Sequence, residues 1–374
     1  MSNLKRVGIL LAIFAVIILF SVSYKGNDIQ ARAIVLGVGV DLEENGDICV
    51  TAEIVSPGNG GEQVGTFSKT VTATGKTVAE ALQQIAVKSG KETSLGQMVL
   101  IVLGEDYFQT DFSDTVDYFI RSDSCKESAI ICCCKGRAQQ LMNYGDAISQ
   151  SVSLSLANKL KGLAKEVAIP SCDLLTYTRS QMELYKTGFL NYVTFEESPN
   201  TSTVNPEQKQ GYFVADRVAV FKANNLIGIL DSQETKGFAI LHNEVSGNVF
   251  AVTDDEDKYL TLRANSKSVD LKQTDGVVSI SVTLEVKLAR TDSFGAGGLF
   301  TAKTESQITK QMLAQAKEQS VELATLFLQK QVRWNFDILN IHEIFRQKYG
   351  SVEEIKTLPM TEIPVNLSVE VKEK

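Results

Sequence analysis

Residues 33–41, AIVLGVGVD, form an apolar run that is the first predicted strand, and the prediction of the fold starts from it. The run is rich in β-branched side chains, and Asn45-Gly46, a pair typical of a hairpin turn, stands a few residues later. Residues 48–56 (ICVTAEIVS) continue as the partner strand, and residues 66–74 alternate like a third strand after a glycine-rich tip at 57–61. The chain therefore predicts a sheet that starts with consecutive hairpin-linked strands.

Helical and strand patterns then alternate along the rest of the first half. Thr77 is the expected cap of a helix over 78–87, in which apolar residues recur at helical spacing. The other expected elements are a strand at 98–103, a helix at 114–120, a strand at 129–134, and helices at 151–163 and 171–184. This order indicates a mixed sheet covered by helices.

A polar segment with two prolines, residues 196–210 (EESPNTSTVNPEQKQ), is the predicted linker. Beyond it the sequence predicts a hairpin that turns at Asn224-Asn225 and a short helix over 235–241. The remaining expected elements are strands at 248–252, 258–264, 276–288 and 364–371 and helices at 306–332 and 336–347. The helix at 306–332 is the longest, and an apolar stripe marks its inner face: Ile308, Met312, Ala316, Leu323 and Phe327.

The predicted fold class is therefore α+β, with two halves. The N-terminal half, residues 25–195, is a mixed α/β sheet domain, with a sheet lobe at 31–137 and a helical extension at 138–190. The C-terminal half, residues 211–374, is an α+β domain in which one long helix crosses an antiparallel sheet.

A membrane segment is expected ahead of both halves. Residues 7–22 (VGILLAIFAVIILFSV) hold no charge and follow Lys5 and Arg6, and with two more residues they would span about 27 Å as a helix. The predicted anchor residues are Val7, Leu10, Leu11, Ile13, Phe14, Ile17, Ile18, Leu19 and Phe20. The flanking positive charges place the N-terminus in the cytoplasm and the rest of the chain outside the membrane. A cleaved signal peptide and a buried soluble helix are the alternatives.

Composition narrows the classes of function. The 374 residues are 44 % hydrophobic and 22 % charged, values typical of folded globular proteins. A net charge of -8 argues against a nucleic-acid partner, which would need a basic surface.

The six cysteines suit more than one interpretation. Three of them lie in SAIICCCKG, a predicted buried strand in which Cys132 and Cys134 share one face and Cys133 takes the other. No pair has the spacing of a zinc site. Buried free thiols are the first expectation, with one or two long-range disulfides, or a metal or redox site, as alternatives.

No catalytic, cofactor-binding or metal-ligating residue is predicted. Gly75-Lys76-Thr77 lacks the first glycine of a phosphate-binding loop, and Gly37-Val38-Gly39 lies inside a strand. Two acidic groups, 41–47 and 254–257, have no EF-hand spacing, and neither histidine, His242 or His342, has a partner in a recognisable motif. Trp334 and Phe336 are interpreted as core residues or as anchors of an interface.

Several stretches resemble one known family. Residues 32–41 (RAIVLGVGVD), 74–82 (TGKTVAEAL), 95–105 (LGQMVLIVLGE) and 117–123 (DYFIRSD) are similar to the N-terminal domain of the Ger(x)C family, the C subunits of spore germinant receptors of endospore-forming Firmicutes. Residues 216–230 (DRVAVFKANNLIGIL) and 334–340 (WNFDILN) resemble segments of its second half. Ser23-Tyr24-Lys25 stands where the family usually has a lipobox cysteine.

This resemblance implies a non-enzymatic accessory subunit at the outer face of the spore inner membrane, needed for the germination response. Its implied partners are an A-type and a B-type integral-membrane receptor subunit, and it implies no cofactor. An extracytoplasmic solute-binding module associated with a transporter is the alternative, and it would require a cleft between two lobes with converging polar groups.

Overall fold

The computed structural model describes residues 13–14, 32–56, 67–146, 151–166, 169–197, 210–242, 246–253, 259–291, 308–349 and 358–374. The first strands are β1 (Arg32–Leu42), β2 (Ile48–Ser56) and β3 (Phe67–Gly75), paired antiparallel in this order as the sequence predicts. Gly46 has a φ of 81°, which suits the turn between β1 and β2 because glycine lacks a Cβ.

Parallel strands extend this sheet on the other side of β1. They are β5 (Leu100–Leu103), β6 (Ile130–Cys134) and β8 (Thr187–Glu197), and two antiparallel strands, β9 (Gln210–Lys222) and β10 (Asn225–Leu230), follow. Among the described residues the strand order is β10-β9-β8-β6-β5-β1-β2-β3, with short β4 (Glu92–Ser94) beside β1 and β7 (Gly145–Asp146) beside β9. The expected mixed sheet is confirmed.

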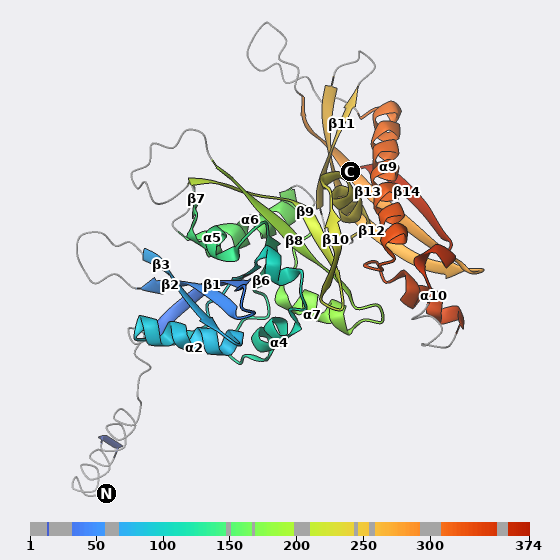
Figure 1. Ribbon diagram of the computed structural model, residues 1–374. Helices are drawn as coiled ribbons and strands as arrows, with labels where there is room; N and C mark the ends of the chain where they lie inside the picture. Colours follow the sequence, from blue (N-terminus) through green and yellow to red (C-terminus); the bar gives the residue numbers. More distant parts are fainter. Residues whose placement is uncertain are drawn as a thin grey trace, which may run out of the picture.

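Helices cover both faces of this sheet (Figure 1). On one face lie α2 (Val78–Ser89), α3 (Glu105–Phe108), α4 (Ser113–Arg121) and α7 (Leu174–Met182), and on the other lie α5 (Ala138–Asn143) and α6 (Val152–Glu166). Successive strand residues feed the two layers, so Cys133 joins the first cluster while Cys132 and Cys134 join the second. This is the division of the three thiols that strand geometry predicts.

Strand β8 was not predicted from the sequence. All residues from Thr187 to Val193 are buried, because the strand lies inside the sheet with neighbours on both sides. A half-buried strand is recognised in a sequence by the alternation of apolar and polar residues. A strand that is buried on both faces lacks this alternation, so β8 could not be recognised in this way. Strands β8 and β9 flank the predicted linker and pair with each other from Thr187↔Lys222 to Glu197↔Gly211. The two halves therefore share one sheet.

The C-terminal half holds a second sheet of order β11-β12-β13-β14. Its strands are β11 (Ser246–Thr253), β12 (Tyr259–Thr274), β13 (Val277–Thr291) and β14 (Val365–Glu373). Alternate residues of β13 are buried from Val278 to Val286, as the predicted half-buried strand requires. The first three strands are antiparallel, and β14 lies at the edge, parallel to β13.

One long helix, α9 (Lys310–Trp334), runs along this sheet (Figure 1). Its buried residues include Met312, Ala316 and Phe327 of the predicted stripe, while Leu323 is half-buried. Helix α8 (Ser232–Leu241) packs against it so closely that a Cβ on Gly237 would lie 2.0 Å from the carbonyl oxygen of Leu323. Helix α10 (Ile341–Tyr349) begins later than the predicted 336–347, and the 3₁₀ turn Met360–Glu362 precedes β14.

Some predictions fall outside the described residues, namely the tip 57–61, the acidic group 254–257, most of the linker and most of the anchor. Of the anchor residues the structure describes Ile13 and Phe14, both helical and exposed to 52 % and 62 %. Within the part of the chain that is described, no helix is both long and apolar enough to cross a membrane.

Candidate functional site

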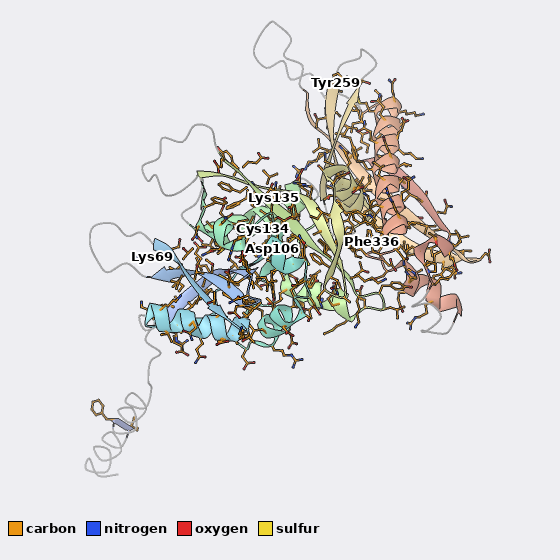
Figure 2. The ribbon with its side chains drawn as sticks, viewed as in Figure 1. Lys69, Asp106, Cys134, Lys135, Tyr259 and Phe336 are labelled. Atoms are coloured by element: carbon orange, nitrogen blue, oxygen red, sulfur yellow. The ribbon has the colours of Figure 1, made fainter. Side chains whose placement is uncertain are left out.

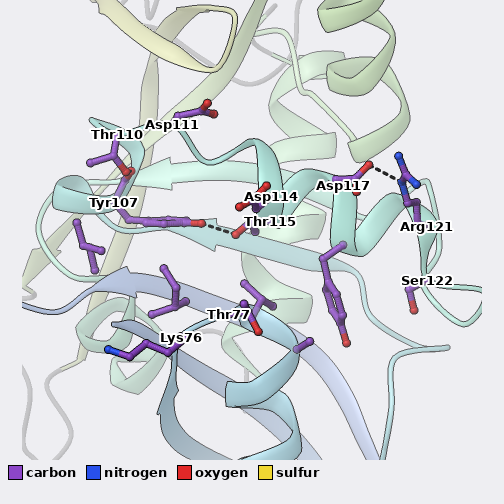
Figure 3. Close-up of a pocket in the computed structure, with 15 residues that line it drawn as sticks. Lys76, Thr77, Tyr107, Thr110, Asp111, Asp114, Thr115, Asp117, Arg121 and Ser122 are labelled. Carbon is purple, nitrogen blue, oxygen red and sulfur yellow. Dashed lines mark hydrogen bonds and ion pairs between the residues drawn. The ribbon is translucent and has the colours of Figure 1, made fainter. Parts of the chain in front are cut away.

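A pocket opens between the start of α2 and the segment that carries α3 and α4 (Figure 3). Its volume is about 690 Å³, within the range of small-molecule sites. Lys76 and Thr77 lie on the α2 side, Tyr107 and Thr115 lie on the opposite side, and Asp117 and Arg121 mark one end. The pocket therefore belongs to the N-terminal half and does not lie between the two halves.

Local sequence explains how α2 reaches the pocket. The Thr77 hydroxyl accepts a hydrogen bond from the backbone N–H of Glu80 at 3.2 Å, and the Glu80 carboxylate accepts one from the N–H of Lys76 at 2.7 Å. These reciprocal bonds satisfy amides at the helix start and fix its direction. The predicted Thr77 cap is confirmed, and the turn before it is a helix start rather than a phosphate loop.

The opposite wall is held by a buried contact between Tyr107 and Thr115, whose hydroxyl groups are hydrogen-bonded. Tyr107 is 5 % exposed, and this burial raises the pKa of its hydroxyl, an effect that the hydrogen bond with Thr115 partly opposes. A neutral, fixed phenol at this position gives the pocket a rigid aromatic wall.

Two ion pairs involve cations that line the pocket. Lys76 pairs with Asp47, and the hydrogen bond from Lys76 lowers the pKa of the Asp47 carboxyl. The Nε of Arg121 lies 2.5 Å from Oδ1 of Asp117, one helical turn earlier on α4. Both cations of the pocket lining are therefore already matched by a carboxylate.

The residues that line the pocket include no histidine and no cysteine. Within the described ranges, no three His, Cys, Asp or Glu side chains come together as a metal site would require. The acidic group 41–47 is used in other ways: Asp41 accepts from the N–H groups of Ala138 and Gln139 at 2.7 and 2.8 Å, and Glu43 pairs with Arg137.

A second polar constellation lies where the two halves meet. Asp337 accepts hydrogen bonds from the backbone N–H groups of Ile341 and His342 at 2.9 and 2.8 Å and lies 2.8 Å from Nδ1 of His342. Nε2 of His342 lies 2.9 Å from the carbonyl oxygen of Leu358, to which the Tyr185 hydroxyl also donates at 3.0 Å. Burial raises the pKa of Tyr185 to about 12.

This constellation is a clamp and not a triad. Asp337 and His342 are each 1 % exposed, and the ring of Tyr185 stacks on the imidazole at 3.6 Å between centroids. Both ring nitrogens already face an acceptor, so neither is free to activate a nucleophile. Local sequence patterns do not reveal this constellation, because Asp337 accepts from amides four and five residues ahead, beyond the spacing of an N-cap side chain, and Tyr185 lies far away along the chain.

The two candidate interface residues have different surroundings. Phe336 is fully buried and packs edge-on against Phe327, so it is a core residue (Figure 2). Trp334 is half-buried. Its ring packs so closely on Gly228 that a Cβ added to this glycine would lie 2.6 Å from the ring. Nζ of Lys330 lies over the same ring, 4.6 Å from its centroid. Trp334 therefore joins α9 to β10, and only its outer part faces solvent.

All six cysteines are free thiols, as first expected. Burial raises the pKa of Cys49 to about 11 and that of Cys125 to about 11, and it raises the pKa values of Cys132, Cys133, Cys134 and Cys172 further. A thiol that stays protonated at neutral pH is a poor nucleophile and a poor metal ligand.

Comparison with known proteins agrees with these features. The family model of the spore germination protein N-terminal domain matches residues 25–195, and that of the spore germination B3/GerAC-like C-terminal domain matches residues 216–373. The chain belongs to the Ger(x)C family of spore germination proteins. Together the two models cover most of this Ger(x)C chain, in the order that the sequence resemblance predicted.

One relative and one solved structure are similar to this chain. Spore germination protein B3 of Bacillus subtilis (strain 168) is 22 % identical over 232 residues, which are 61 % of this chain and 59 % of that protein. The crystal structure of the GerBC protein is 14 % identical, covers 90 % of this chain and 96 % of its own, and superposes with a TM-score of 0.50. This second likeness shows that the two chains share a fold.

Proposed function

We propose that this Ger(x)C chain is a non-enzymatic accessory subunit of a spore germinant receptor complex. The observation that carries the proposal is the match of both family domains, in order and on one chain. The subunit is held at the outer face of the spore inner membrane by residues 7–22, and it acts through contacts with the A-type and B-type integral-membrane subunits.

The chemistry of the described residues supports a role in contact rather than turnover. The pocket is lined by carboxylates, hydroxyls and two matched cations, and the buried Asp337–His342 pair is used to hold the halves together. An enzyme would bring a nucleophile and a base together in an accessible site. A large sheet shared by both halves instead gives a rigid body that can present surfaces to partners.

The alternative is an extracytoplasmic solute-binding module. The size of the pocket favours it, at about 690 Å³. The position of the pocket disfavours it, because the pocket lies within the N-terminal half rather than between two lobes that could close. Uptake and germination assays of a deletion strain separate the two, since loss of uptake of an amino acid, sugar or nucleoside with unchanged germination would support the solute-binding role.

The test of the proposal is a spore-forming strain that lacks the gene for this chain. We expect its spores to lose the response to the cognate germinant, the full chain to restore it, and a chain without residues 1–24 to fail. A Gly162→Ala chain is the control for expression, because a Cβ at Gly162 meets nothing within 4 Å. Unchanged germination of the deletion spores, or full rescue by the shortened chain, would contradict the proposal.

A further inference from the structure

The pocket beside α2 combines an apolar interior with aromatic sides. Ile48 and Leu42 come from the first hairpin and Val78 from the first turn of α2, while Tyr107 and Tyr118 come from the opposite segment. The hydrogen bond between the hydroxyl groups of Tyr107 and Thr115 holds the Tyr107 ring in place. Tyr118 is half-buried. Such a lining favours an organic molecule over a hydrated metal ion, because it offers apolar area and two aromatic rings, of which that of Tyr118 is the more exposed.

The charge of the pocket is negative once its ion pairs are counted. Lys76 is matched by Asp47, and Arg121 is matched by Asp117. Asp111 accepts a hydrogen bond from the N–H of Ser113 at 2.9 Å, but neither Asp111 nor Asp114 has an ion-pair partner among the described residues. Two carboxylates are therefore left without a counter-charge at one site.

The start of α2 does not reverse this balance. A helix N-terminus carries partial positive charge, which would favour an anion. Here the Thr77 hydroxyl and the Glu80 carboxylate already accept hydrogen bonds at that end, and Glu80 places a negative charge in the first turn. The electrostatic potential on the opposite side of the pocket is negative as well. Burial raises the pKa of Tyr107, and the negative charges of Asp114 and Asp111 raise it further.

We propose that this pocket binds a small organic cation, a protonated amine carried on an apolar or aromatic body. The ammonium group lies near Asp114, and the body fills the space between the tyrosine rings and the apolar residues of the first hairpin and α2. Attraction of the cation to the face of a tyrosine adds to attraction by the carboxylates. The inference concerns the chain alone and does not rest on its role in a receptor complex.

The experiment uses three probes with the same body and different charges: phenethylamine, 2-phenylethanol and 3-phenylpropionate. Each is titrated into the full chain in detergent, with binding followed by ligand-observed NMR. We expect the amine to bind about fivefold more tightly than the alcohol, and the carboxylate to bind most weakly. The Asp114→Asn chain should bind the amine about threefold more weakly.

The matched control is Asp270→Asn, which removes the same charge from an exposed position on β12 and leaves the amine affinity unchanged. It also separates binding by the pocket from partition into detergent, which is equal for both variants. Equal affinities for the amine and the alcohol, equal affinities for the two variants, or no binding of the amine at millimolar concentration would each overturn the proposal. A germination defect without amine binding would overturn this inference alone.

Discussion

Asp337 accepts hydrogen bonds from two backbone amides and faces an imidazole nitrogen, all inside the core. Its backbone N–H also lies 3.4 Å from the Thr187 hydroxyl of β8, while His342 and Tyr185 both reach Leu358. Asp337 thus contacts β8 through its backbone N–H and the start of α10 through its carboxylate, and His342 extends the network to the segment before β14. A buried carboxylate of this kind stabilises the folded state strongly, because it would cost free energy to leave the amides and the imidazole that it contacts buried without a hydrogen-bond partner.

Replacing Asp337 by alanine should destabilise the full chain by about 3 kcal/mol, because two amides and an imidazole lose their acceptor in a buried site. The measurement is equilibrium denaturant unfolding at pH 7. The control is Glu343→Ala, which breaks a partly exposed pair with Arg346 on the same helix and should change stability by at most about 0.5 kcal/mol. Similar losses for the two variants would contradict the role of Asp337.

Glu43 predicts a pH dependence. The hydrogen bond from Arg137 lowers the pKa of Glu43 below 4.5, so ionised Glu43 stabilises the folded state above that pH and the stabilisation is lost as pH falls through the folded pKa. An Arg137→Gln chain should be less stable than the parent at pH 7, by about 1 kcal/mol at most, and the gap should narrow toward pH 4. The difference in stability between the two chains is measured from denaturant midpoints at several pH values. A difference that widens as pH falls would contradict the stabilising role of ionised Glu43.

At this scale the sequence predicted local features and missed distant ones. The Thr77 cap and the Asn45-Gly46 turn depend on neighbouring residues, and both are present. The pocket places Lys76, Tyr107 and Arg121 in one lining, and the clamp stacks the ring of Tyr185 on that of His342. These groupings depend on how sheet and helices pack, which a local pattern does not encode.

Among the elements, α8 packs closely against α9 at a glycine. Gly237 leaves room for the backbone of α9 at Leu323, and Phe238 and Phe327 stack beside it at 5.2 Å. Both helices were predicted from their patterns, but their approach was not, since a glycine inside a helix is an ambiguous signal.

Gly237→Ala should destabilise the full chain by about 2 kcal/mol or more, because the new methyl group overlaps the backbone of α9 and the helices must separate. Gly162→Ala is the matched control: it also lies in a helix, its Cβ would meet nothing within 4 Å, and it should raise stability by about 0.5 kcal/mol. Thermal unfolding followed by circular dichroism compares the two. Equal stability of both variants would contradict the close packing.

Strand order was beyond the sequence pattern too. The expected hairpin that turns at Asn224-Asn225 and the expected strand at 364–371 are present, yet their alternation does not indicate that β9 pairs with β8 or that β14 runs parallel to β13. Pairing partners are chosen by non-local packing, and β8 itself is hidden by burial on both faces.

For the whole molecule, the shared sheet has a consequence for dissection. A chain of residues 25–197 keeps β8 but loses β9 and β10, so it exposes the edge of a buried strand and should aggregate. A chain of residues 25–231 retains both strands and should stay more soluble. Size-exclusion chromatography of the two compares them, and a monodisperse 25–197 fragment that melts cooperatively would show that the N-terminal half needs no strand from beyond the linker.

The central claim is that the chain works by contact with integral-membrane receptor subunits. Its most direct test is affinity purification of the tagged full chain from detergent-solubilised spore membranes, with mass spectrometry of the eluate. The account predicts that an A-type and a B-type subunit elute with the tagged chain in comparable amounts and are absent from an untagged control. Recovery of the chain alone from membranes that contain both subunits would contradict it.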